Sequence, residues 1–193
     1  MTRAFVAICL DESTRATVAA EIERLRPLGR AVAWVPPENL HLTLKFLGRQ
    51  SDERLAEVVQ ALEQTGSGQA PFAIRLHGLG AFPGMEHPRI LWIGVAEGVP
   101  AMRALQSAVE SELGRRGFPP EDRAWHAHLT IGRVFDPRRW RRDASPALRE
   151  SIAHAATRDF GTLEVGRVVL MRSDLGRAGA RYSELRSVGL AAE

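Results

Sequence analysis

The chain has 193 residues, of which 45% are hydrophobic and 25% charged, and its formal net charge is +3 at pH 7. This composition is ordinary for a globular domain, and the charge is too small for a nonspecific binder of duplex nucleic acid. No apolar run is long enough to cross a bilayer, so we expect no membrane association. The single cysteine, Cys9, excludes an internal disulfide. The short apolar run from Ala4 to Leu10 is followed at once by Asp11 and Glu12, which indicates a first strand and not a signal peptide, so we expect a cytoplasmic protein.

Strand-like and helix-like segments alternate along the whole chain. Strands are expected at about 3–10, 31–35, 40–48, 71–80, 89–96, 126–135, 162–172 and 180–188, and helices at about 12–28, 52–64, 100–116 and 146–157. Ser13, Ser51 and Ser145 are the expected N-caps. The order β-α-β-β-α-β occurs twice, which indicates an α+β protein with antiparallel sheets, each covered by helices.

Two tetrads repeat one another at a distance of 87 positions: His41-Leu42-Thr43-Leu44 and His128-Leu129-Thr130-Ile131. The same offset aligns the apolar run 5–8 with 92–95 and the helical stretch 12–28 with 99–115. Internal repetition of this kind indicates a duplicated architecture. We therefore predict one bilobal domain over residues 1–193, with halves at about 1–87 and 88–193 and a central cleft between two pseudo-symmetric lobes.

The tetrads carry the residue types that proton transfer at a phosphate requires. In a strand, residues two apart point to the same face, so each histidine shares a face with its threonine. Histidine exchanges protons near neutral pH, and two of them could activate water and protonate the leaving oxygen of a phosphodiester. Thr43 and Thr130 would donate hydrogen bonds to the phosphate oxygens, and neither a metal nor a cofactor is needed. His41 and His128 are thus the predicted catalytic residues.

Two basic residues follow the tetrads and are further candidates for phosphate binding. Simple alternation places Lys45 on the face of His41. Arg133 falls on the face opposite His128 in an ideal strand, so it contributes only if a bulge or the strand end redirects it.

The segments from His41 to Gly48 and from His128 to Val134 resemble the two HxTx signatures of the two-histidine (2H) phosphoesterases. Within that superfamily, the whole chain is most similar to the bacterial and archaeal RNA 2′,3′-cyclic phosphodiesterases, also called 2′-5′ RNA ligases. The resemblance implies a bilobal α+β fold with the active site in its central groove. It also implies metal-independent hydrolysis of a terminal 2′,3′-cyclic phosphate to a 2′-phosphate, with ligation as the reverse reaction.

The same resemblance implies the residue roles. His41 would be the proton donor, His128 the proton acceptor, and Thr43 and Thr130 the phosphate contacts, with Arg133 matching a frequent arginine of the family. The expected partner is RNA with a 2′,3′-cyclic phosphate end, or a small cyclic nucleotide. Its terminal base would stack on an aromatic ring. The candidates are Trp34, Phe46, Trp125 and Trp140, and packing in the core is the alternative role of each. Because the duplicated cleft is complete within one chain, we expect a monomer.

Two other interpretations remain open from the sequence. His126 and His128 lie on one strand face and could chelate zinc, with His41 as a third ligand, in a zinc-dependent phosphodiesterase. Alternatively, the chain could be a noncatalytic module that binds RNA ends and uses the histidines only as hydrogen-bond donors.

Overall fold

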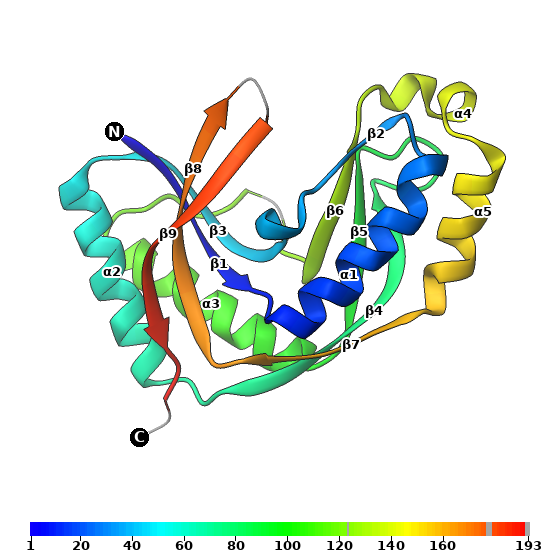
Figure 1. Ribbon diagram of the computed structural model, residues 1–193. Coiled ribbons are helices and arrows are strands. Elements are labelled where there is room, and N and C mark those ends of the chain that lie inside the picture. The colour runs from blue at the N-terminus through cyan, green and yellow to red at the C-terminus, as the bar shows by residue number, and fades with distance from the viewer. Residues whose placement is uncertain (123, 177–178, 192–193) are drawn as a thin grey trace.

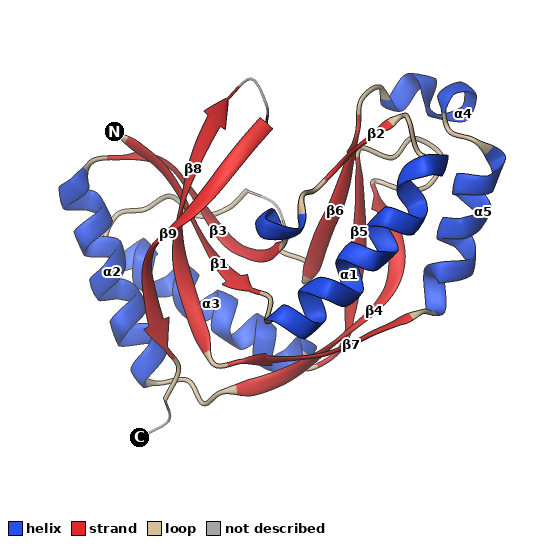
Figure 2. Cartoon of the chain, in the orientation of Figure 1, coloured by secondary structure: helices blue, strands red, loops and turns tan. Residues whose placement is uncertain are grey.

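The computed structural model describes residues 1–122, 124–176 and 179–191, and Figure 2 shows its helices and strands. The strands are β1 Thr2–Cys9, β2 Val32–Trp34, β3 His41–Gln50, β4 Phe72–Phe82, β5 Ile90–Glu97, β6 His128–Val134, β7 Asp159–Val165, β8 Arg167–Gly176 and β9 Gly179–Gly189. The helices are α1 Glu12–Leu25, α2 Asp52–Ser67, α3 Val99–Arg115, α4 Trp140–Asp143 and α5 Pro146–His154.

Within the described residues the strands form one antiparallel sheet in the order β7-β4-β5-β6-β3-β1-β8-β9, and β2 is added beside β6. The two central strands, β3 and β6, are joined through a single residue pair, Leu42 with Leu129. The sheet consequently divides into two lobes at this point (Figure 1). The predicted α+β class with two lobes is confirmed, and the two expected sheets are one sheet that is continuous through one pair.

Each lobe combines segments from both halves of the sequence. Helix α1 follows β1 but packs against β7, while α3 follows β5 but packs against α2 and β3. Figure 1 accordingly shows α1 and α5 with β4, β5 and β6, and α2 and α3 on the side of β1, β8 and β9. The expected boundary near residue 87 therefore divides the sequence but does not separate the lobes.

A continuous hydrophobic core lies beneath the junction of β3 and β6. Leu42, Leu44, Leu129 and Ile131 are all completely buried and belong to one cluster that extends into both lobes. Burial of this apolar surface is the main favourable contribution to folding. Trp140, in the arginine-rich segment before α5, is also completely buried, so its indole is part of the core and cannot stack on a base.

Two of the three expected N-caps are found at the starts of helices, and the third helix is capped by a different residue. Ser51 accepts a hydrogen bond from the Arg54 amide at 3.3 Å and Ser145 one from the Leu148 amide at 3.1 Å, as predicted. Helix α1 is capped by Asp11 and not by the expected Ser13, because the Asp11 carboxylate accepts from the Thr14 amide at 2.7 Å. A carboxylate at this position also interacts favourably with the positive end of the helix dipole.

The expected strand 162–172 is two strands that belong to opposite ends of the sheet. Strand β7 pairs with β4 in one lobe, and β8 pairs with β1 and β9 in the other. The run looks continuous in sequence because both strands are apolar on their buried faces, and only Gly166 separates them.

Substitution Leu42→Ala should lower the free energy of unfolding by about 2–5 kcal/mol, because it removes buried methyl groups where the two lobes meet. Urea denaturation measures this loss. The control Leu185→Ala removes the same atoms from a side chain of β9 that is 42% exposed, and it should cost less than about 0.5 kcal/mol. Equal losses in the two variants would show that the Leu42 junction does not stabilise the fold.

Candidate active site

The pairing of Leu42 with Leu129 brings the two tetrads together on one face of the sheet. Continuing this antiparallel register by one residue sets His41 opposite Thr130 and Thr43 opposite His128. All four side chains are half-buried, on the face away from the buried leucines. Two histidines and two threonines thus surround one point, with the same type of residue on each diagonal.

Strand β3 contains a bulge directly after its tetrad. Thr43 pairs with Ala7 but Lys45 pairs with Val6, which leaves Leu44 as an extra residue in β3. A bulge of this kind shifts the alternation of side chains by one position. Lys45 therefore points into the core, next to Leu44, and the expectation that it shares the face of His41 is wrong.

Lys45 has its own partners on the core side. Its side chain is 2% exposed, and its Nζ atom lies 2.7 Å from Oε1 of Glu110 and 2.7 Å from the carbonyl oxygen of Pro119. Glu110 also accepts from the amide of Glu121 at 3.1 Å. Lys45 thus ties α3, through Glu110, and the segment that leads to β6, through Pro119, to the back of β3.

Strand β6 contains the equivalent bulge. Thr130 pairs with Trp92 and Gly132 pairs with Leu91, so Ile131 is the extra residue. The shift turns Gly132 toward the core and exposes Arg133 on the face of Thr130. This is the redirection that a role for Arg133 requires, and the positive charge of Arg133 acts on both His41 and His128.

Both histidines are held by a backbone carbonyl two residues earlier in the chain. Nδ1 of His41 lies 2.7 Å from the Asn39 oxygen, and Nδ1 of His128 lies 2.8 Å from the His126 oxygen. A carbonyl oxygen only accepts, so Nδ1 carries a proton in each ring. Nε2 is left in both cases as the nitrogen that can gain or lose a proton.

The protonated forms of both rings are disfavoured in the free protein. Burial lowers the pKa of His41, and the nearby charges of Arg133 and His128 lower it further, against the opposite effect of the Asn39 carbonyl. Burial likewise lowers the pKa of His128. The hydrogen bond to the His126 carbonyl raises this pKa, and the charges of His126 and Arg133 lower it further. An anion bound between the rings would offset this concentration of positive charge.

Aromatic rings that the sequence analysis did not single out pack against the two imidazoles. Phe5 lies 4.8 Å from the ring centre of His41, and Tyr182 meets the same ring edge-on at 5.2 Å. Phe82 meets the His128 ring edge-on at 5.1 Å. These residues come from β1, β9 and β4, and only the sheet order, which the sequence does not state, brings them to the tetrads.

The aromatic residues expected to stack on a base occupy different environments. Phe46 is 59% exposed and Trp34 is 9% exposed. The indole nitrogen of Trp125 donates to the carbonyl of Thr43 at 3.0 Å, which ties the segment before β6 to β3. Of the four candidates, Phe46 alone is exposed, and it occupies the position after its bulge that Arg133 occupies in β6.

The zinc interpretation lacks a third ligand. Across residues 1–122, 124–176 and 179–191, no group of three or more His, Cys, Asp or Glu side chains is arranged to hold a metal ion. His126 is exposed beside His128 and makes an aromatic contact of 6.0 Å with Phe82.

In the same described ranges, no helix has the length and apolar character to cross a membrane.

Comparison with known proteins gives the family of the chain. Residues 14–177 match the sequence profile of the 2′-5′ RNA ligase superfamily. The chain belongs to this superfamily, one of two-histidine phosphoesterases. A relative from Methanothermobacter thermautotrophicus, named RNA 2′,3′-cyclic phosphodiesterase, is 37% identical over 183 residues, which cover 95% of this chain and 96% of the relative. A relative of the same name from Aquifex aeolicus is 33% identical over 182 residues, which cover 94% of this chain and 93% of the relative.

Solved structures of related proteins share the fold. A crystal structure of a Thermus thermophilus protein matches with a TM-score of 0.77 and 31% identity, over 99% of both chains. Escherichia coli LigT in complex with 3′-AMP matches with a TM-score of 0.76 and 25% identity, over 98% of both chains. The bilobal superfamily fold expected from the paired motifs is therefore confirmed.

Replacement by methionine should lower stability much more at Lys45 than at Arg133. Lys45→Met leaves the Glu110 carboxylate without its ammonium partner and should lower the free energy of unfolding by about 2–4 kcal/mol. This is less than for a fully buried pair, because the Glu110 side chain is 24% exposed. Arg133→Met, at an exposed position, should change stability by less than about 0.5 kcal/mol. Urea titrations measure the free energy of unfolding of both variants. A larger loss of stability for Arg133→Met than for Lys45→Met would contradict the bulge assignment.

Proposed function

We propose that the protein is an RNA 2′,3′-cyclic phosphodiesterase that hydrolyses a terminal cyclic phosphate to a 2′-phosphomonoester without a metal ion. The observation that carries this proposal is the pair of imidazoles on one sheet face, each with Nδ1 bound to a carbonyl and Nε2 available. Relatives that carry this activity in their names match nearly the whole chain. The catalytic pair is His41 and His128, and the phosphate-binding residues are Thr43, Thr130 and Arg133.

The reaction divides the two proton transfers between the two rings. His128 takes a proton from water through Nε2, and the water oxygen forms a bond to phosphorus. The bond between phosphorus and O3′ breaks on the opposite side, and His41 delivers a proton from Nε2 to O3′. Each transfer is general acid–base catalysis by a group that titrates near the working pH. The product retains the phosphate on O2′.

The remaining residues act on the charge of the phosphate. The hydroxyls of Thr43 and Thr130 donate to the two non-bridging oxygens, and the Arg133 guanidinium neutralises the charge that develops on them. Donors fixed on strands keep this geometry without reorganisation during the reaction. Lys45 has no part in it, because its ammonium is engaged by Glu110.

The substrate class we propose is the 3′ end of cleaved RNA or a small nucleoside 2′,3′-cyclic phosphate. Binding of 3′-AMP by the related LigT supports a nucleotide-sized site. Exposed Phe46, on the face of His41 beyond the bulge, is the ring best placed to stack on the terminal base. Because one chain supplies every group, we propose that the enzyme acts as a monomer, and that it acts in the cytoplasm.

Replacing either His41 or His128 with alanine should lower kcat for a nucleoside 2′,3′-cyclic phosphate by about 10²–10⁴-fold, the usual contribution of one acid–base group. The assay contains EDTA, and chromatography identifies the phosphomonoester that forms. His87→Ala, a change at an exposed histidine outside both tetrads, is the matched control and should leave kcat unchanged. Wild-type protein that binds the nucleotide without turnover would instead identify a noncatalytic RNA-end binding module.

The pH profile of kcat/KM should be bell-shaped, because one histidine must be neutral and the other protonated. Both histidine pKa values are lowered from the ordinary value of about 6.5, so the maximum should lie below pH 6.5. Arg133→Met removes a charge that lowers both values and should move the maximum to higher pH. Arg138→Met, at an exposed position outside the site, should not. A rate that rises steadily to high pH would contradict the two-histidine mechanism.

A further inference from the structure

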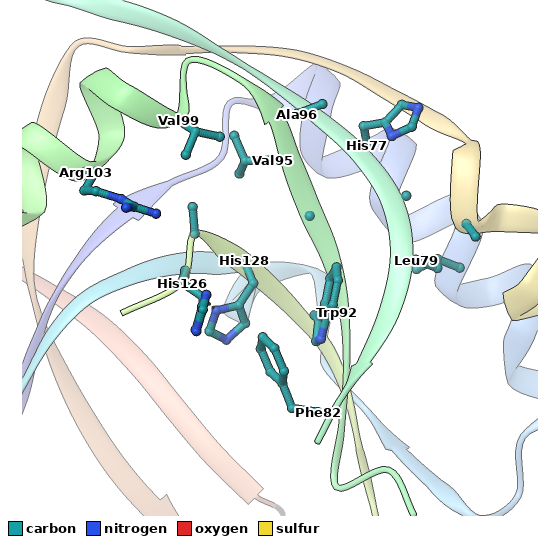
Figure 3. Close-up of a pocket in the computed structure, with 14 residues that line it drawn as sticks. His77, Leu79, Phe82, Trp92, Val95, Ala96, Val99, Arg103, His126 and His128 are labelled. Carbon is teal, nitrogen blue, oxygen red and sulfur yellow. Dashed lines mark hydrogen bonds between the residues drawn. The ribbon is translucent and has the colours of Figure 1, made fainter. Parts of the chain in front are cut away.

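A pocket of about 450 Å³ opens beside His128 and is lined mainly by residues of β4, β5 and α3 (Figure 3). His128, Phe82 and Trp92 form one end, and Val99 and Arg103 of α3 lie toward the other. The volume is that of a site for a small molecule of nucleoside size. His41 does not line this pocket, so the pocket adjoins only one of the two catalytic rings.

The Trp92 indole lies close against the neighbouring backbone, and two glycines make room for it. A Cβ atom at Gly80 would come within 2.3 Å of Cζ2 of this ring, and one at Gly94 within 3.1 Å of Cζ3. The Phe82 ring lies 5.1 Å from the Trp92 ring and 5.1 Å from His128. The pocket consequently has an aromatic wall that continues from the catalytic imidazole, a surface on which a nucleobase can stack.

The position of the pocket has a chemical meaning that rests on the proposed function. In-line displacement at phosphorus requires the entering and leaving oxygens to lie on opposite sides. If His41 transfers a proton to O3′ of the cyclic nucleotide, then His128 takes a proton from the oxygen that attacks phosphorus from the opposite side. Water needs little space, whereas this pocket could hold a whole nucleoside next to the entering oxygen.

We propose that the pocket binds the nucleoside that carries a 5′-hydroxyl, when this hydroxyl replaces water in 2′-5′ joining and when it departs in the reverse cleavage. In cleavage, His41 takes the proton from the 3′-hydroxyl, and O3′ forms a bond to phosphorus. The bond between phosphorus and O5′ breaks, and His128 gives a proton to O5′. The products are a 2′,3′-cyclic phosphate and a free 5′-hydroxyl nucleoside, so atoms and protons balance without water.

Arg103 is placed to contact a second phosphate, the one that follows the nucleoside in the pocket. Its side chain is exposed on α3 and points toward the pocket on the side of His126 (Figure 3). A nucleoside stacked near Trp92 continues the RNA through its own 3′-phosphate, and a guanidinium pairs well with phosphate oxygens. The pocket is thus suited to the first nucleotide of an acceptor strand.

The test compares two substrates that differ only in the group on the His128 side. Adenosine 2′,3′-cyclic phosphate places water there, and 2′-5′-linked diadenosine monophosphate places a nucleoside there. Ala96→Trp fills the pocket from an exposed position of β5. It should lower kcat/KM for dinucleotide cleavage about tenfold or more, a loss of about 1.4 kcal/mol per factor of ten, and leave cyclic nucleotide hydrolysis within about twofold. Ala73→Trp makes the same change on an exposed part of β4 outside the pocket lining, and it should affect neither reaction.

A second variant addresses the phosphate contact. Arg103→Gln should lower cleavage of a trinucleotide with a 2′-5′ bond followed by a 3′-5′ bond about fivefold or more, and leave the dinucleotide within about twofold. Arg30→Gln, at an exposed position outside the pocket, controls for lost charge.

Each outcome has a distinct meaning. Wild-type enzyme that hydrolyses the cyclic nucleotide but does not cleave the dinucleotide would overturn the pocket assignment and leave the proposed function intact. Equal effects of Ala96→Trp on both substrates, or no effect on either, would also overturn the assignment. Failure of wild-type enzyme on both substrates would overturn the proposed function itself.

Discussion

The site depends on one cross-strand pair, Leu42 with Leu129, at the centre of the sheet. Because side chains alternate along a strand, burying these two leucines forces the histidines and threonines beside them to the opposite face. The core thus orients the polar groups, and a shift of one residue in register would bury imidazoles and expose leucines. The same four-residue pattern places its apolar residues in the core and its histidine and threonine on the open face, and it does so in both β3 and β6.

Much of this arrangement could be predicted from the tetrads, because period-two alternation is local and reliable over three residues. The bulges could not be predicted, since Leu44 and Ile131 are ordinary strand residues and nothing in their type announces an unpaired position. Each bulge reverses the faces beyond it. For this reason alternation placed Lys45 wrongly and placed Arg133 on the opposite face.

The aromatic surroundings of the histidines were missed for a different reason. Phe5, Phe82 and Tyr182 reach the tetrads through the order of strands in the sheet, which depends on long-range pairing. Local propensity carries no information about such pairing. The two histidines could therefore be found from their tetrads, whereas the aromatic rings that pack against them could not.

The crossing of α1 and α3 to the opposite lobes has a mechanical consequence. The chain passes from one lobe to the other six times: after β1, between β2 and β3, between α2 and β4, after β5, between α3 and β6, and between β7 and β8. A hinge would have to bend at all of these connections together, so the groove is stiff and its two walls keep their spacing. Each lobe takes its core from both halves of the sequence, so we expect the two lobes to unfold together in one cooperative transition.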